Sequence, residues 1–238
     1  MIMRAEVGVG GTRGADPAGV EQDGPVSRVW DCRDPGQREG AIAAAVSAVR
    51  RGELVVLPTD TVYGIGVDAF APRGVAALLA AKGRGRDMPV PVLVGSWTGI
   101  DGLVDVVTGE VRELVQAFWP GGLTLVVQHS LRLAWDLGDA RGTVAVRMPL
   151  HPVALEVLHE TGPMAVSSAN RSGQSPATTA GQARAQLGDS VDVYLEAGPT
   201  RDSTPSAIVD CTSSPPRLLR AGAVGIDELR AVVPALVA

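Results

Sequence analysis

Aromatic residues and net positive charge are both lacking in this chain of 238 residues. Phe, Trp and Tyr together make up 3% of the sequence, which argues against a surface of stacked aromatics that binds single-stranded nucleic acid. The net charge is −5, so the protein has no overall positive field with which to attract nucleic acid. Only a local basic patch could serve that purpose.

Cysteine and histidine are sparse, and their positions match no common metal or disulfide pattern. Cys32 and Cys211 are too few to stabilise a domain of this size through disulfides. His129, His151 and His159 are scattered along the chain and have no further ligand near the closer pair. We therefore expect reduced thiols and no dedicated metal site.

Long hydrophobic runs are absent as well. No apolar run approaches the ~20 residues that a membrane-spanning helix requires, and no secretory signal is recognisable. The sequence therefore predicts a cytoplasmic protein without membrane contact. Residues 1–25 are Gly-rich with few large apolar side chains, which predicts a disordered tail. Residues 26–238 have the length of one domain with a large core.

Lysine occurs once, at Lys82, among 21 positively charged residues, so the other positive charges are all arginine. An ammonium group is compact, whereas a guanidinium is a wide planar fork. A single lysine in an arginine-rich chain therefore indicates a position where the fork would not fit. Biased codon usage is the alternative explanation.

Apolar periodicity and turn residues divide the chain into alternating strands and helices, although the last strands cluster together. Pro91 predicts that its strand is an edge strand or begins irregularly, and Gly64, Gly66 and Asp68 predict a turn-rich connection. The pattern predicts an α/β or α+β fold with a mixed, twisted sheet and flanking helices. The expected strands are 26–32, 54–57, 90–94, 123–127, 143–148, 164–166, 191–195, 206–209 and 217–219, and the expected helices are 35–51, 72–79, 110–118, 151–160, 179–187 and 226–236.

Four predicted strand or helix ends open onto small polar or cationic residues: 59–61, 82–84, 146–149 and 167–170. Loops at strand ends are where ligands bind in open α/β sheets. Hydroxyls, an amide and converging cations favour an anionic substrate, most naturally a phosphate. The standard phosphate-binding and dinucleotide-binding glycine motifs do not occur. Taken singly, these residues could also be turn residues, helix caps or surface charges.

Seven segments of the chain, four of them at or beside these positions, form a recognisable set. The segments are Pro58-Thr59-Asp60-Thr61-Val62-Tyr63-Gly64-Ile65-Gly66, Lys82-Gly83-Arg84, Trp119-Pro120-Gly121-Gly122-Leu123-Thr124-Leu125, Val144-Ala145-Val146-Arg147-Met148-Pro149, Ser168-Ala169-Asn170-Arg171-Ser172-Gly173, Pro205-Ser206-Ala207-Ile208-Val209-Asp210 and Leu219-Arg220-Ala221-Gly222. Together they resemble the YrdC/TsaC family of threonylcarbamoyl-AMP synthases, over roughly residues 28–225 and in the order of the family. The resemblance implies a twisted open sheet with a large, positively lined concave cavity.

The reaction that the resemblance implies is a nucleotidyl transfer. L-Threonine, bicarbonate (or CO2) and ATP would give threonylcarbamoyl-AMP and pyrophosphate, for the threonylcarbamoyladenosine modification of tRNA. Mg²⁺ would accompany the ATP phosphates, and no prosthetic group is expected. Expected partners are the proteins that transfer the threonylcarbamoyl group onward, with tRNA binding weakly at most.

The resemblance also assigns residues to roles. Lys82, Arg84, Ser168 and Asn170 would be catalytic, since the two cations grip the ATP phosphates and the other two position the reacting carbamate. The full set of ATP-binding residues would be Lys82, Arg84, Arg86, Thr143, Asn170, Thr178 and Arg220. Threonine would contact Thr59, Thr61, Tyr63, Arg147, Ser168 and Ser206, with Arg147 pairing with its carboxylate.

Three positions depart from the family. Gly85 stands where a proline usually follows Lys-x-Arg, Gly122 replaces a common proline, and Ala207 replaces a threonine, which removes a hydroxyl. Two other functions stay open. One is an RNA-binding module that uses the basic cavity without catalysis. The other is a carbamoyl-transfer module like that of hydrogenase-maturation proteins, whose acylphosphatase and zinc-finger segments this chain lacks.

Overall fold

The computed structural model describes residues 28–200 and 204–238, so the predicted tail at 1–25 lies outside the described residues. The strands are β1 (Arg28–Asp31), β2 (Val55–Leu57), β3 (Gly64–Asp68), β4 (Val92–Leu93), β5 (Leu123–Gln128), β6 (Thr143–Arg147), β7 (Met164–Ser168), β8 (Val193–Glu196), β9 (Ala207–Asp210) and β10 (Arg217–Arg220). The helices are α1 (Pro35–Arg50), α2 (Pro72–Lys82), α3 (Gly109–Phe118), α4 (Pro152–Thr161), α5 (Ala180–Leu187) and α6 (Ile226–Val232), with short 3₁₀ helices η1 (Trp97–Gly102) and η2 (Gly188–Ser190).

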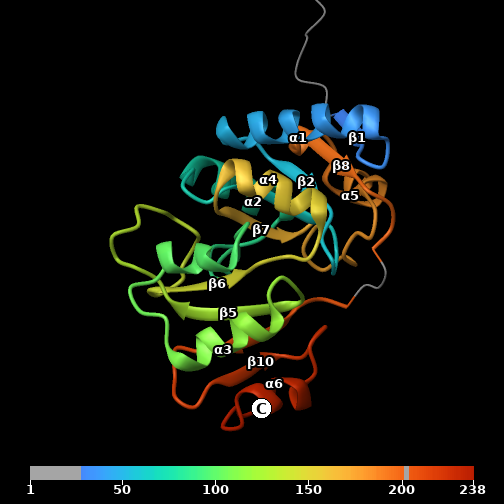
Figure 1. Cartoon of the computed structure of the whole chain (residues 1–238). Helices are drawn as coiled ribbons and strands as arrows, with labels where there is room; N and C mark the ends of the chain where they lie inside the picture. The colour runs from blue at the N-terminus through green and yellow to red at the C-terminus, as the bar shows by residue number, and fades with distance from the viewer. Residues whose placement is uncertain (1–27, 201–203) are drawn as a thin grey trace, which may run out of the picture.

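The ten strands form one mixed sheet in the order β1-β8-β2-β3-β7-β4-β6-β5-β9-β10. Strand β8 is parallel to both β1 and β2, whereas β3 is antiparallel to β2 and β7. Further along, β4 is parallel to β6 and β5 is parallel to β9. Figure 1 shows β1 and α1 at one end of the molecule and β10 and α6 at the other. The prediction of a mixed sheet with flanking helices is confirmed.

Local sequence signals explain where several helices begin and end. The Asp34 carboxylate accepts a hydrogen bond from the backbone N–H of Gly36 at 2.9 Å, and Pro35 supplies the first helical residue of α1. The Thr179 hydroxyl caps α5 in the same way, at 3.1 Å from Gln182 N. Helix α2 ends at Gly83, whose φ of 61° is left-handed and therefore suits glycine. These caps satisfy backbone groups that a helix end leaves without partners.

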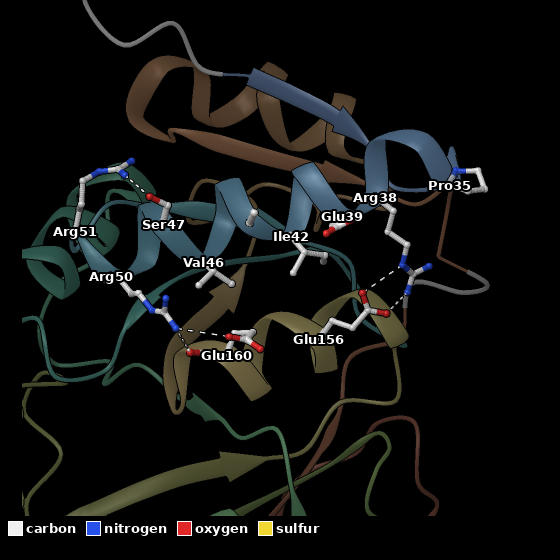
Figure 2. Close-up of a pocket in the computed structure, with 11 residues that line it drawn as sticks. Pro35, Arg38, Glu39, Ile42, Val46, Ser47, Arg50, Arg51, Glu156 and Glu160 are labelled. Atoms are coloured by element: carbon white, nitrogen blue, oxygen red, sulfur yellow. Dashed lines mark hydrogen bonds and ion pairs between the residues drawn. The ribbon is translucent and has the colours of Figure 1, made fainter.

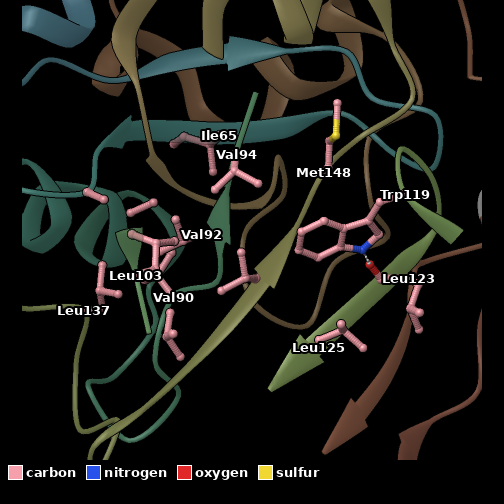
Figure 3. Close-up of a cluster of buried hydrophobic side chains, with 14 of the residues drawn as sticks. Ile65, Val90, Val92, Val94, Leu103, Trp119, Leu123, Leu125, Leu137 and Met148 are labelled. Carbon is pink, nitrogen blue, oxygen red and sulfur yellow. Dashed lines mark hydrogen bonds between the residues drawn. The ribbon is translucent and has the colours of Figure 1, made fainter. Parts of the chain in front are cut away.

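Alternate residues of the central strands pack on opposite faces of the sheet. Val55 and Leu57 of β2 belong to a core cluster with α1 and α4, whereas Val56 belongs to a second cluster with α2, α3 and α5. This alternation is the period-two pattern of a strand, and both faces are apolar because helices cover both. Figure 3 shows part of the second cluster around Trp119, whose indole N–H donates to the Leu123 carbonyl at 2.8 Å.

The segment 64–68 is a strand, so the prediction of a turn-rich connection was wrong. Strand β3 pairs with β7 along its whole length, from Gly64 opposite Ser168 to Asp68 opposite Met164. The glycines serve close packing. A Cβ on Gly64 would lie 2.7 Å from Val166 Cγ1, and a Cβ on Gly66 would lie 2.8 Å from Val166 Cγ2. Glycine inside a strand often marks such a close approach.

Two further expectations were wrong in their boundaries. Strand β4 has two residues rather than five and lies between β7 and β6, so Pro91 precedes an interior strand rather than an edge strand. Its irregular start was predicted correctly, and the Pro91 carbonyl still accepts from Val166 N at 2.8 Å. The last helix ends at Val232 rather than at residue 236, because Pro234 disfavours helical geometry in the residue before it.

Candidate active site

Lys82, the last residue of α2, is buried with only 3% of its surface exposed. Its ammonium donates to the backbone carbonyls of Asn170, at 2.7 Å, and Ser168. No carboxylate in residues 28–200 and 204–238 forms an ion pair with it. Burial, together with the nearby charge of Arg84, lowers the pKa of Lys82 to about 8. This group is therefore a desolvated cation held by carbonyl dipoles.

Two buried polar atoms beside Lys82 have no hydrogen-bond partner among the described residues: Arg84 Nε and Asn170 Oδ1. The rest of the Arg84 guanidinium contacts Ser167 Oγ at 3.2 Å and the Pro89 carbonyl at 3.4 Å. The Asn170 amide nitrogen donates to the carbonyls of Arg171 and Gln174 at 2.9 and 2.8 Å. Because buried polar atoms are normally paired, an unpaired donor and an unpaired acceptor here point to a ligand.

A second group surrounds Arg147, which is the last residue of β6 and is 7% exposed. Its Nε–H donates to the Gly121 carbonyl at 2.9 Å, and its two terminal nitrogens donate to Thr61 Oγ1 at 2.9 Å and Asp60 Oδ1 at 2.6 Å. Asp60 Oδ1 also accepts from the backbone N–H of Leu150 at 2.8 Å. Burial lowers the pKa of Arg147, and the adjacent Asp60 charge opposes that shift.

Strand β5, the residue before β9 and the end of β10 contribute a third set of polar groups. The hydroxyls of Thr124 and Ser206 are buried and lie 2.8 Å apart. Arg220, at the end of β10, donates to the Ser206 carbonyl at 2.7 Å and lies 3.2 Å from its hydroxyl. Burial is the main cause of the lowered pKa of Arg147, and the charge of Arg220 adds to it.

The loop at 58–63 lies between the Lys82 and Arg147 groups and contacts both. On one side, Asp60 and Thr61 bind Arg147. On the other, the Tyr63 carbonyl accepts from Ala169 N at 2.7 Å, and Gly64 pairs with Ser168. Within the loop, Thr59 Oγ1 lies 3.1 Å from Thr61 Oγ1. The structure therefore brings together most of the residues that were predicted as a site from separate parts of the sequence.

Other predicted residues lie elsewhere or have different partners. Arg86 is exposed and forms ion pairs with Asp136 at 2.7 Å and Asp139 at 3.5 Å, rather than turning toward Lys82. The Tyr63 hydroxyl is buried 2.7 Å from the Gly198 carbonyl. Thr178 hydrogen-bonds to Gln182 at 3.0 Å, and Thr143 donates to the Ala140 carbonyl at 2.8 Å.

The sequence predictions assigned no role to two residues of the site, Asp60, which lies in the candidate segment 59–61, and Thr124. Asp60 stands between two assigned residues, Thr59 and Thr61, whereas Thr124 lies in a quoted motif that holds no assigned residue. Because successive residues of a strand face opposite sides, Thr124 could have been recognised as the polar residue between Leu123 and Leu125.

The Ala207 side chain lies in the apolar core cluster. The alanine that departs from the family pattern is therefore a packing residue rather than a polar group of the site. Gly122 is also explained, since a Cβ there would lie 2.6 Å from Ala223 Cβ.

A groove of about 810 Å³ lies between α1 and α4, and none of the residues of these groups lines it. Figure 2 shows Ile42 and Val46 facing it, with the pairs Arg38–Glu156 and Arg50–Glu160 across it. The predicted positively lined cavity therefore stays a prediction. In the described residues, no three His, Cys, Asp or Glu side chains gather as metal ligands, and none of the helices there is long and apolar enough to span a membrane.

Comparison with known proteins places this geometry in a family context. Residues 47–222 match the Sua5/YciO/YrdC family model, described as "Telomere recombination". A Mycobacterium tuberculosis protein named "Putative threonylcarbamoyl-AMP synthase" is 59% identical over 87% of this chain and 96% of its own length. A Thiobacillus denitrificans protein named "Threonylcarbamoyl-AMP synthase" is 35% identical over 77% of this chain and 97% of its own.

A solved structure supports the same relationship at the level of the fold. The Pyrococcus abyssi Sua5 protein, crystallised in complex with L-threonine, superposes with a TM-score of 0.84 at 32% identity. The match covers 89% of this chain and 63% of that protein. The chain thus spans about three fifths of the length of this solved relative.

Proposed function

The chain belongs to the Sua5/YciO/YrdC family, and on that premise we propose that it condenses L-threonine, bicarbonate or CO2, and ATP to threonylcarbamoyl-AMP and pyrophosphate. The observation that carries the proposal is the pairing of two cationic groups, around Lys82 and around Arg147, on either side of one polar loop. One group suits phosphates and the other suits a carboxylate. A reaction between an amino acid and ATP needs both, close together.

We propose that the Lys82 group binds the ATP phosphates. Lys82 has three N–H donors, of which two meet carbonyls, so one is left for a phosphate oxygen. The unpartnered Arg84 Nε–H supplies a second donor. Cations in a buried site stabilise the charge that develops as pyrophosphate leaves, at no cost of reorganisation. A compact ammonium can contact the Ser168 and Asn170 carbonyls and a phosphate at the same time, which explains why lysine rather than arginine occupies this position.

Asn170 needs a different kind of partner. Its amide nitrogen is engaged by two carbonyls, which fixes the orientation of the amide, and the free Oδ1 is an acceptor that a phosphate oxygen cannot satisfy. We propose that Oδ1 meets a cation or a donor that arrives with the nucleotide. Mg²⁺ carried by the ATP phosphates, or one of its bound waters, fits this requirement.

The Arg147 group is the proposed threonine site. Three of the five guanidinium N–H groups of Arg147 are used within the protein, which leaves two for a carboxylate. The hydroxyls of Thr59, Ser206 and Thr124 are buried nearby and can pair with the polar groups of the amino acid. Recognition of a substrate hydroxyl by buried polar groups is the strongest available basis for selectivity against analogues that lack it.

The proposed chemistry balances without a covalent enzyme intermediate. Once its ammonium group has lost a proton to water, the threonine amine adds to CO2 with release of a second proton, or to bicarbonate with loss of water, and forms a carbamate. A carbamate oxygen then attacks the α-phosphorus of ATP, and the bond to pyrophosphate breaks. The protein holds the reactants in line and stabilises charge. The product would serve the modification of tRNA in the cytoplasm through separate threonylcarbamoyl-transfer proteins.

The test is pyrophosphate release from ATP in the presence of bicarbonate, with and without L-threonine, and with L-serine or glycine in its place. Release that depends on L-threonine supports the proposal. The matched control is Lys82→Ala, in which release is expected to fall by about a hundredfold or more, as for other charged groups that stabilise a transition state. Absence of release with any amino acid, together with salt-dependent RNA binding, would favour the RNA-binding module instead.

A further inference from the structure

Among the described residues, Asp60 is the carboxylate that forms an ion pair in the Arg147 group, and its two oxygens differ in their surroundings. Oδ1 accepts from Arg147 at 2.6 Å and from the backbone N–H of Leu150 at 2.8 Å. Among the described residues, no donor contacts Oδ2. The side chain is 18% exposed. One oxygen thus fastens the 58–63 loop to the end of β6, while the other is an open acceptor beside the guanidinium.

The charges around this oxygen are suited to an α-amino acid. In such a substrate, a single carbon separates the ammonium group from the carboxylate. A carboxylate that is held on the free N–H groups of Arg147 therefore brings its own ammonium next to whatever lies beside that guanidinium. Asp60 lies there, and it is negative. Hydrogen bonds between charged groups in a site shielded from water are stronger than neutral ones.

We propose that Asp60 Oδ2 accepts the ammonium group of the substrate and makes the site selective for an α-amino acid over a simple hydroxy acid. The inference rests on the proposed function, because it takes the Arg147 group as the carboxylate site. Asp60 would have two roles that use different oxygens: Oδ1 holds Arg147 and the backbone N–H of Leu150, and Oδ2 binds the substrate. Asp60 therefore binds substrate directly and also positions Arg147.

The substitution Asp60→Asn separates the two roles. An asparagine whose oxygen replaces Oδ1 keeps both hydrogen bonds, to Arg147 and to Leu150 N. It places an NH2 group where Oδ2 was, and two donors then face each other when an ammonium binds. The measurement is equilibrium dialysis with labelled L-threonine, displaced by two analogues. L-Threonine methyl ester has the ammonium but no carboxylate, and 3-hydroxybutyrate has the carboxylate but no ammonium.

In Asp60→Asn, binding of L-threonine and of its methyl ester is expected to weaken by about tenfold or more, while displacement by 3-hydroxybutyrate stays unchanged. An equal loss for both analogues would overturn the proposal, because Asp60 would then act only through Arg147. Unchanged binding of both analogues would overturn it as well. Circular dichroism of the variant, compared with that of the unmodified protein, checks that it folds.

A second comparison covers the case in which the variant does not fold once the buried Arg147 loses its counter-charge. On the unmodified protein below pH 7, L-threonine methyl ester is compared with methyl 3-hydroxybutyrate, which differs only in lacking the ammonium. Stronger displacement by the amino ester is expected, and equal displacement contradicts the proposal. The proposed function fails differently, through pyrophosphate release that does not depend on threonine, so the two failures are distinguishable.

Discussion

Lys82 and Arg147 are both buried cations, but the protein compensates their charges in different ways. Arg147 has a carboxylate at 2.6 Å, from Asp60, whereas Lys82 has only backbone carbonyls. A guanidinium keeps its proton in either setting, and an ammonium does not. The charge of the Lys82 group therefore varies near neutral pH, and that of the Arg147 group does not.

The depressed pKa of Lys82 predicts how the use of ATP depends on pH. The group is charged below its pKa of about 8 and loses its charge above it. Because kcat/KM reports the free enzyme, we expect kcat/KM for ATP, at saturating threonine, to fall as the pH rises through about 8. Lys82→Arg, whose charge persists, should show no such fall in whatever activity it retains. A flat profile in the unmodified protein would contradict the assignment of Lys82 to the phosphates.

Arg147 and Arg220 have different predicted partners. Arg147→Ala is expected to raise the KM for threonine by about a hundredfold, since the loss of a buried charge partner costs about 2–5 kcal/mol, with little change in the KM for ATP. Arg220→Ala is expected to raise the KM for ATP and to leave the KM for threonine nearly unchanged. The increase should be smaller than in Arg147→Ala, because Arg220 is exposed. Steady-state kinetics with each substrate varied in turn checks both. Equal effects on the two substrates in Arg147→Ala would show that it is not the carboxylate partner.

At the scale of single residues, the motifs indicated several side chains that lie together, but neither all of the cations nor their partners. Lys82, Arg84, Ser168 and Asn170 do lie together. Arg86 is only two residues from Arg84, yet it pairs with Asp136, and nothing in the local sequence separates the two arginines. Asp60 was overlooked for the same reason, because its partner Arg147 is remote in the chain and contacts of that kind are set by tertiary packing.

Strand β3 shows why one element was mistaken for another. Two glycines in five residues indicate a turn when the chain is considered locally, but here they let β3 approach β7 closely. What requires glycine at these positions is the Val166 side chain, which belongs to a strand about a hundred residues further along the chain. Glycine in a strand is a packing feature that a single sequence does not distinguish from a turn.

The tight contact gives a prediction about stability. Gly66→Ala would place a Cβ 2.8 Å from Val166 Cγ2 and 3.1 Å from Met164 Cε, and we expect a loss of about 1–3 kcal/mol in the free energy of unfolding. Gly102→Ala is the matched control, because a Cβ there meets nothing within 4 Å. Denaturant unfolding measures both, and the added change Val166→Ala should restore part of the loss. Equal stability of the Gly66 and Gly102 variants would contradict this account of β3.

For the whole molecule, the class of fold could be predicted and the strand order could not. Apolar runs and helix caps revealed most elements and a mixed sheet. The order places β8 between β1 and β2, and β9 beside β5. These pairings join segments far apart in the chain, and the runs of Val, Leu and Ile that make them are chemically alike. The order therefore depends on how all the elements pack together.

The proposed reaction joins a carbon from bicarbonate to threonine before the α-phosphorus of ATP is attacked. The most direct measurement is mass analysis of the nucleotide product formed from ATP, L-threonine and ¹³C-labelled bicarbonate, with Lys82→Ala as the control. We predict an adduct of AMP with threonine that carries the labelled carbon, and its loss in the control. A threonine–AMP adduct without the label, or no adduct at all, would contradict the account.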